Sequence, residues 1–167
     1  YGEDLLALVH NKKIFKWEPS VPNLTVRAVV ITGTEVPTAS RDMVVSVPDR
    51  HLICIGTETT LQTANTQDDM FVRWSNQESQ TVWTPTATNT AGSQRLTDGS
   101  KLIGAIVGKT AVYLWSDTAM YTMKFIGQPF TFGFTQVGTN CGMSSQHAAA
   151  EVDGIAYWMG PTGFFNF

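Results

Sequence analysis

Histidines and serines are the residues in this chain that metal or nucleophilic chemistry would use. The three histidines, His10, His51 and His147, show neither an i, i+4 spacing nor a His-Glu-x-x-His pattern. No serine lies in a Gly-x-Ser-x-Gly elbow. His51 and His147 each open an apolar, strand-like run, which favours a structural role in a turn over metal binding. The sequence therefore predicts no metal site, no cofactor site and no catalytic serine.

Carboxylates are the remaining catalytic candidates, because glycoside hydrolysis needs a facing pair of them. Asp117 and Asp153 have the sequence context of β-turn formers. Only Glu151 lies inside a predicted inner strand, and one carboxylate does not make a pair. We therefore expect a protein that is not an enzyme, and a carbohydrate-active or carbohydrate-binding propeller stays open as the alternative. The carboxylates considered are Asp49, Asp68, Asp69, Asp117, Glu151 and Asp153.

Cysteine and charge content restrict the classes of partner. Cys54 lies in an apolar run and is interpreted as a small buried hydrophobe, whereas Cys141 lies in a glycine-rich loop, and the two form no zinc or disulfide pattern. Charged residues make up 15% of the chain and the net charge is −3, so the whole chain does not attract nucleic acid. The basic cluster of Lys12, Lys13 and Lys16 is interpreted as a solvated hairpin edge, and contact with phosphate stays open.

The elements that would position these residues are strands, since helical signals are almost absent. Three apolar runs, His51–Gly56, Lys101–Val107 and His147–Val152, each lead into an aromatic-rich run. Their starts are 50 and 46 residues apart, a repeat length typical of propeller blades. We predict an all-β fold of β-propeller-like blades, each of four antiparallel strands, as part of a larger propeller.

The predicted blades divide the chain into one propeller fragment, 1–167, with about three to four units. These are roughly a partial blade at 1–42, blades at 43–100 and 101–138, and a partial blade at 139–167. The start at Tyr1 and an end inside an apolar run at Phe167 lead us to expect a piece of a longer protein. No apolar run is long enough to predict a membrane span.

Individual strands and turns can also be predicted. The run Gln80–Trp83 is predicted to be a strand, and the polar stretch Thr84–Ser100 a connection available for contacts with neighbours. Asp153-Gly154 is a strong two-residue hairpin signal. Trp74, Trp115 and Trp158 are predicted to close second strands and to pack between adjacent blades.

About one third of the chain has a recognisable sequence pattern. The segment from Leu114 to Phe134 reads Leu-Trp-Ser-Asp-Thr-Ala-Met-Tyr-Thr-Met-Lys-Phe-Ile-Gly-Gln-Pro-Phe-Thr-Phe-Gly-Phe, and Val-Asp-Gly-Ile-Ala-Tyr-Trp-Met-Gly follows at 152–160. With the glycine-containing loop at 138–142 between them, these segments resemble the packaged-DNA stabilisation or tail-nozzle proteins of short-tailed bacteriophages.

The resemblance implies a structural protein located in the virion tail and assembled in the host cytoplasm. It implies a homo-oligomeric ring that contacts other tail or portal-proximal proteins and lets double-stranded DNA pass at ejection. No catalytic residue is carried over. The matching positions are architectural, namely Trp115, Asp117, Tyr121, Gly127, Pro129, Asp153, Gly154, Tyr157 and Trp158.

Overall fold

The computed structural model describes residues 2–19, 25–47 and 49–167. These residues form four antiparallel β-sheets and a single 3-10 turn, η1 (Ala64–Thr66). The predicted all-β fold of antiparallel sheets is therefore confirmed. Within the described ranges, no helix is long and apolar enough to cross a membrane.

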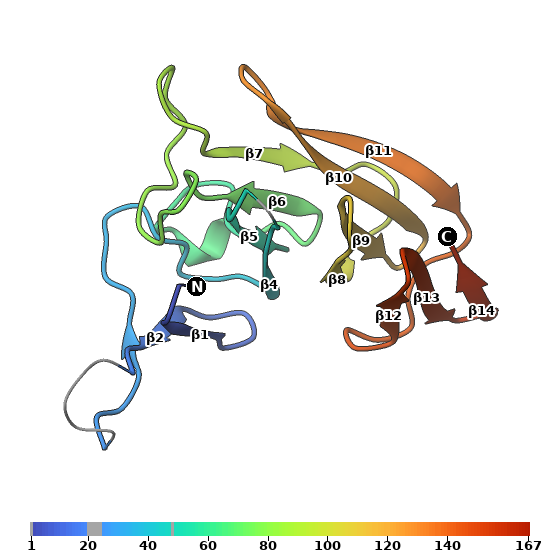
Figure 1. Cartoon of the computed structure of the whole chain (residues 1–167), viewed down its shortest axis with the longest axis horizontal. Coiled ribbons are helices and arrows are strands. Elements are labelled where there is room, and N and C mark those ends of the chain that lie inside the picture. Colours follow the sequence, from blue (N-terminus) through green and yellow to red (C-terminus); the bar gives the residue numbers. More distant parts are fainter. Residues whose placement is uncertain (1, 20–24, 48) are drawn as a thin grey trace.

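Each sheet is a meander in which every strand pairs with the next strand along the chain. The sheets follow one another along an arc, with β7 and β11 on its outer side and β4, β8 and β12 toward the concave side (Figure 1). The first sheet contains β1 (Leu5–Leu8), β2 (Ile14–Trp17) and β3 (Val29–Val30). The second contains β4 (Asp42–Val45), β5 (Leu52–Ile55), β6 (Phe71–Trp74) and β7 (Gly92–Arg95). The third contains β8 (Leu102–Val107), β9 (Val112–Ser116), β10 (Ala119–Gly127) and β11 (Thr131–Thr139). The fourth contains β12 (Ala149–Val152), β13 (Ile155–Gly160) and β14 (Gly163–Asn166).

Strands in the middle of the arc are covered on both faces, and β5 shows why. Successive side chains of a strand point to opposite faces of the sheet. Leu52 and Cys54 pack in the apolar layer shared with the first sheet. Ile53 and Ile55 pack in the layer shared with the third sheet. The whole strand is apolar and fully buried because both of its faces are interfaces.

Tryptophans lie in the layers between sheets, as predicted. The rings of Trp115 and Trp158 have centroids 5.4 Å apart between the third and fourth sheets. Trp74 contacts Phe132 of the third sheet edge-to-face at 5.4 Å. The prediction that Trp74 closes a second strand is wrong, however. Trp74 ends β6, which is the third strand of its sheet.

The predicted inner position of the run His51–Gly56 is also wrong. Its strand, β5, is second in its sheet, and the first strand is β4. First strands begin at Asp42, Leu102 and Ala149, so the structural spacing is 60 and then 47 residues. The apolar content of β5 made it look like β8, but this content reflects burial on both faces and not its place in the sheet.

The fourth strand of the second sheet was missed. Gln80–Trp83 is not a strand, although Trp83 is fully buried and donates its indole N–H to the carbonyl of Gln80 at 3.0 Å. The fourth strand, β7, lies inside the stretch predicted to be a connection, Thr84–Ser100. β7 is an edge strand with exposed Gln94 and Arg95, so it lacks the apolar pattern that predicts buried strands.

Two predicted hairpins are confirmed. β1 and β2 pair in register from Leu5↔Trp17 to Leu8↔Ile14. Asp153 and Gly154 join β12 to β13 with φ values of 54° and 86°. Positive φ at both central residues is the geometry that an Asp-Gly turn favours.

Candidate functional site

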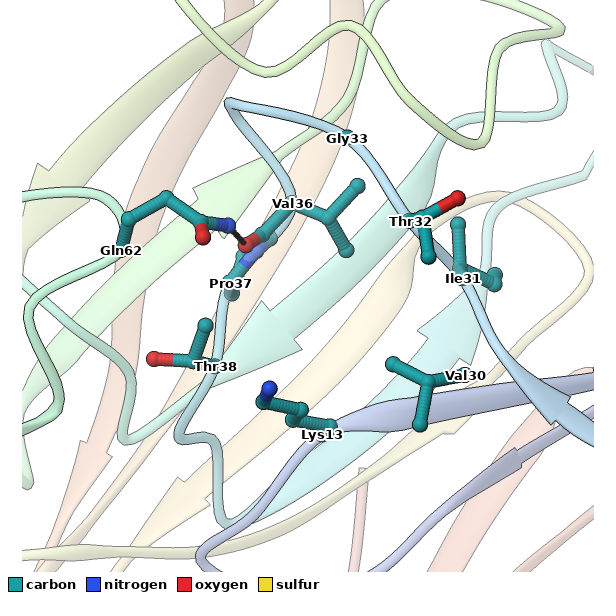
Figure 2. A pocket seen from close by; sticks show the side chains of 9 residues that line it. All are labelled: Lys13, Val30, Ile31, Thr32, Gly33, Val36, Pro37, Thr38 and Gln62. Atoms are coloured by element: carbon teal, nitrogen blue, oxygen red, sulfur yellow. Dashed lines mark hydrogen bonds between the residues drawn. The ribbon is translucent and has the colours of Figure 1, made fainter.

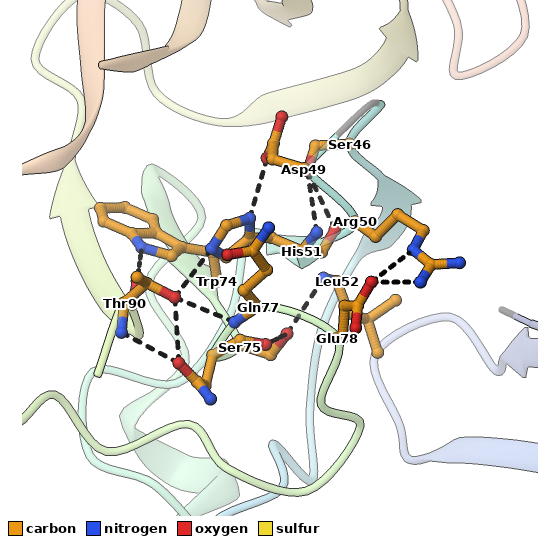
Figure 3. A network of polar contacts seen from close by, with 11 residues as sticks. Ser46, Asp49, Arg50, His51, Leu52, Trp74, Ser75, Gln77, Glu78 and Thr90 are labelled. Carbon is orange, nitrogen blue, oxygen red and sulfur yellow. Dashed lines mark hydrogen bonds and ion pairs between the residues drawn. The ribbon is translucent and has the colours of Figure 1, made fainter. Parts of the chain in front are cut away.

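A buried polar network surrounds His51 in the second sheet (Figure 3). His51 precedes β5 and has no exposed surface. Its Nδ1 lies 2.8 Å from Oδ2 of Asp49, and its Nε2 lies 2.9 Å from the hydroxyl of Thr90, just before β7. The network therefore joins the β4–β5 turn to a segment that is 39 residues away in the sequence.

The β4–β5 turn sets the position of Asp49 and His51. The hydroxyl of Ser46 donates to Asp49 Oδ2 at 2.7 Å and accepts the backbone N–H of His51 at 2.9 Å. Arg50 has a φ of 49°, which reverses the chain, and its side chain pairs with Glu78. The side-chain hydroxyl of Ser46 thus holds both members of the Asp–His pair.

The protonation state of the network follows from its burial. Burial lowers the pKa of His51 below its ordinary value, and the hydrogen bond and charge of Asp49 only partly oppose this shift. An ionised carboxylate only accepts hydrogen bonds, so Nδ1 of the neutral imidazole carries the proton toward Asp49. Nε2 is then an acceptor, and the single hydroxyl proton of Thr90 lies between it and Oδ1 of Asn76, which already accepts the backbone N–H of Thr90 at 3.0 Å.

Carboxylate, imidazole and hydroxyl in this order have the connectivity of a hydrolytic triad. The hydroxyl of Thr90, however, already accepts the backbone N–H of Gln77 at 2.9 Å and lies 3.0 Å from Oδ1 of Asn76. The rings of Phe125 and Phe132 pack against the imidazole at 5.6 and 5.0 Å. His51 has no exposed surface, and its contacts join the β4–β5 turn to the segments at Gln77 and Thr90, so we call the arrangement a latch between loops.

A cavity of about 280 Å³ adjoins this network between the second and third sheets. Asp49 and Ser46 form one wall, Lys109 lies on the turn opposite, and Phe125 and Phe132 supply apolar surface. Asp49 is 8% exposed, and no ion pair joins it to Lys109 in the described structure. The cavity brings together turns of two neighbouring sheets that carry opposite charges.

A second cavity, of about 240 Å³, lies beside the segment that connects the first and second sheets (Figure 2). The amide of Gln62 donates to the carbonyl of Val36 at its edge, and Lys13 and Thr38 contribute polar groups. Among the described residues lining it there is neither a carboxylate nor an aromatic ring. It therefore lacks the paired acids that glycoside hydrolysis needs.

Four of the carboxylates considered as catalytic candidates each make a separate local contact. Asp117 accepts the backbone N–H of Ser100 at 2.8 Å, and Glu151 accepts that of Gly154 at 2.7 Å. Asp68 pairs with Arg95 at 2.7 Å and Asp69 with Arg41 at 2.6 Å. Their hydrogen bonds lower the pKa of Asp68 and Asp117 against the opposing effect of burial. They hold turns and loops in place.

A buried pair of opposite charges was missed by sequence reasoning. Glu58 is fully buried and accepts the backbone N–H of Thr38 at 3.0 Å, while its Oε2 has no hydrogen-bond partner. Arg73 donates to the backbone carbonyls of Glu58 and Thr59 at 3.2 and 2.8 Å. Burial lowers the pKa of Arg73, and the charge of Glu58 opposes that shift. Glu58 sits in a threonine-rich stretch that looks solvent-exposed, so nothing local predicts its burial.

The other sequence candidates are dispersed. His10 contacts the carbonyl of Arg41 at 3.1 Å, and His147 is exposed near β12. Over the described ranges, no three His, Cys, Asp or Glu side chains gather to hold a metal ion. The interpretation of Cys54 as a buried hydrophobe is confirmed, and burial raises the pKa of its thiol to about 12.

The basic cluster is divided by the β1–β2 hairpin. Lys16 pairs with Glu18 and, at 3.7 Å, with Asp4, and the hydrogen bond to Glu18 is the main reason that its pKa is raised. Lys13 lines the cavity of Figure 2, and Lys12 lies in the turn. Lys12 and Lys13 also line one further cavity together, whereas Lys16 is engaged by the carboxylates of Asp4 and Glu18.

Comparison with known proteins gives no family for this chain. No model of a protein family matches it, and no curated protein has significant sequence similarity to it.

Proposed function

We propose that the chain is a structural virion protein of a tailed phage. In this role it forms part of the tail nozzle or head-completion ring, which retains packaged DNA and lets it pass at ejection. The supporting observation is that the residues that match the tail-nozzle pattern make structural contacts in this chain. Trp115 and Trp158 pack against each other between sheets, and the hydroxyl of Tyr121 accepts the backbone N–H of Asp98 at 2.7 Å. Asp153 and Gly154 form a hairpin turn.

The charge of the concave side of the arc fits passage of DNA. The strands β4, β8 and β12 contain Asp42 and Glu151 as their charged residues and carry neither lysine nor arginine. Cations on such a surface would bind phosphates and release counterions, which would retain the DNA. A lining that is apolar or acidic lets DNA slide past.

Rigidity is the second requirement for such a part. Three apolar layers join consecutive sheets, and Asp42 on β4 accepts the backbone N–H of Ala105 on β8 at 3.4 Å. The latch at His51 ties loops within the second sheet. Force on one sheet is therefore carried to the next.

The test is immunogold electron microscopy of phage particles that contain this protein, with antibodies raised against this chain. The expected result is gold at the tail-proximal vertex of virions, with label retained after the DNA has been ejected. Label confined to host cells, or glycan cleavage by the purified chain, would contradict the proposal. Binding to double-stranded DNA is expected to be weak at physiological salt, measured by filter retention.

A further inference from the structure

A cavity of about 320 Å³ lies between the outer strands of the second and third sheets. One wall is β7 with the loop that precedes it, and the other is the β10–β11 turn with the start of β11. The loop before β7 and the β10–β11 hairpin extend past β7 on the same side of the arc (Figure 1). A small molecule in this cavity would therefore contact both sheets.

Aromatic rings form the apolar part of the cavity, and their positions are fixed by the fold. Trp74 donates its indole N–H to the carbonyl of Thr90 at 2.9 Å (Figure 3). Gly92 allows this ring to lie directly on β7, since a Cβ there would be 2.3 Å from it. Phe132 and Phe134 contact the indole with ring centroids 5.4 and 5.8 Å away. Because these rings are already in place, a ligand does not have to order them.

Phe130 is the most exposed of the lining rings. It is 73% exposed in the β10–β11 turn, whereas Trp74 and Phe132 are 4 and 5% exposed. The face of an aromatic ring carries partial negative charge, which attracts the weakly positive hydrogens of C–H groups. Phe130 therefore offers an accessible platform for a ligand face that consists of C–H groups.

Hydroxyl and amide groups supply the polar side chains of the cavity. Thr131 is 3% exposed and Ser93 is half-buried, and neither hydroxyl forms a hydrogen bond within the described part of the chain. Asn89 instead holds the loop, since its amide accepts the backbone N–H of Thr86 at 3.0 Å and donates to the carbonyl of Thr84 at 2.9 Å. Each of the two free hydroxyls can both donate and accept a hydrogen bond to a ligand.

The backbone at Thr131 is strained. Its φ of 61° lies in the left-handed region, where a β-branched residue is rarely found. Such conformations persist only where the surrounding structure imposes them, and they cluster at ligand sites. Here the strain occurs at the residue whose free hydroxyl lies against the cavity.

The lack of charge restricts the class of ligand. None of the described residues that line the cavity is charged, so an ionic group would lose its hydration without gaining a counter-charge. A purely apolar ligand would leave the hydroxyls of Ser93 and Thr131 without partners. A sugar ring has both a C–H face and hydroxyl groups that donate and accept. The volume lies at the lower end of the roughly 300–1,000 Å³ of small-molecule sites, which suits a short saccharide.

We propose that this cavity binds a neutral saccharide, with the C–H face of one sugar ring on Phe130 and sugar hydroxyls paired with Ser93 and Thr131. Among the described lining residues there is no carboxylate, so the acid pair that glycoside hydrolysis needs is missing and we expect binding without cleavage. The inference goes beyond the proposed virion role and rests on the cavity alone.

The test is an NMR titration of the ¹⁵N-labelled 167-residue chain with four neutral sugars. The probes are methyl α-glucopyranoside, methyl α-mannopyranoside, methyl β-galactopyranoside and N-acetylglucosamine, each at up to about 50 mM. A ligand with about a dozen heavy atoms is expected to bind with a dissociation constant on the order of millimolar. At least one probe should give saturable shifts at the amides of Ser93, Gln94 and Thr131, and no saturable shift with any of the four would overturn the inference.

Substitutions of Phe130 test the aromatic platform. Phe130→Leu keeps an apolar side chain but removes the ring, and it should weaken binding by about threefold to tenfold. Phe130→Tyr keeps the ring and should bind within about twofold of the wild-type chain. Phe164→Leu is the matched control, because Phe164 is 86% exposed on β14 and does not line this cavity. Circular dichroism checks that each variant is folded.

Three further outcomes count against a saccharide site. Equal binding by Phe130→Leu and the wild-type chain, or shifts confined to residues outside 85–94 and 129–134, would remove the cavity from the interaction. Tighter binding of a tetraproline peptide than of every sugar would assign the cavity to peptides instead. Virion labelling reports on the proposed function independently, so failure of either proposal can be told from failure of the other.

Discussion

Replacing Thr90 by valine tests whether the His51 network is a closed latch. Thr90→Val keeps the shape of the side chain and removes the hydroxyl that lies 2.9 Å from Nε2 of His51. Because His51 has no exposed surface, water cannot replace that partner. An unsatisfied buried acceptor costs about 1–3 kcal/mol, whereas the exposed N–H of Gln77 is resolvated at little cost. Thr90→Ser keeps the hydroxyl and loses one half-buried methyl, at less than about 0.8 kcal/mol.

The assay is urea unfolding followed by tryptophan fluorescence, with Trp74 as a reporter because its indole N–H donates to the carbonyl of Thr90 at 2.9 Å. Thr90→Val should unfold at lower urea than Thr90→Ser with an unchanged dependence on denaturant. Its thermal midpoint should fall by about 2–4 °C for each kcal/mol lost. Equal stability of the two variants would refute the latch. Ester hydrolysis by the wild-type chain that disappears in a fully stable Thr90→Val would give the network a catalytic role instead.

Three further predictions concern buried groups. The pKa of His51 is lowered in the folded chain, so just below pH 6.5 only the unfolded chain takes up this proton. The stabilising contribution should be fully present above that pH, and the free energy of unfolding should fall below it by up to about 1.4 kcal/mol per pH unit. Denaturant titrations should find this slope missing in His51→Gln. Gly92→Ala should lower the unfolding temperature, since a Cβ there would lie 2.3 Å from the Trp74 ring. Gly133→Ala should not, because its Cβ would meet the nearest atoms at 3.4 Å. An equal fall in unfolding temperature for the two variants would contradict the packing. Cys54, with its thiol pKa raised to about 12, should resist a thiol reagent at pH 8 in the folded chain and react in denaturant, which mass spectrometry can follow.

Strand positions were predictable wherever burial imposes a local pattern. β5 and β8 were recognised because a strand that lies in an apolar layer must carry apolar residues along its length. The Asp153-Gly154 turn was recognised because few residues accept positive φ. β7 was not, since an edge strand with exposed Gln94 and Arg95 carries no such pattern.

Order within a sheet was less predictable than the strands themselves. β5 and β8 have similar apolar runs but occupy second and first places in their sheets. Their similarity comes from being covered on both faces, and apolar content does not distinguish the two positions. The pairing of β4 with β5 and its contact with the third sheet decided the question.

The sequence by itself determined that this chain is all-β, roughly where its strands lie, and that its tryptophans pack between sheets. These properties depend on side-chain alternation and turn chemistry, which act over a few residues. Only the tertiary structure decided that Glu58 and Arg73 are buried and that His51 meets Thr90 across 39 residues. Such features depend on which sheet faces pack together, and that is a property of contacts between residues far apart in the chain.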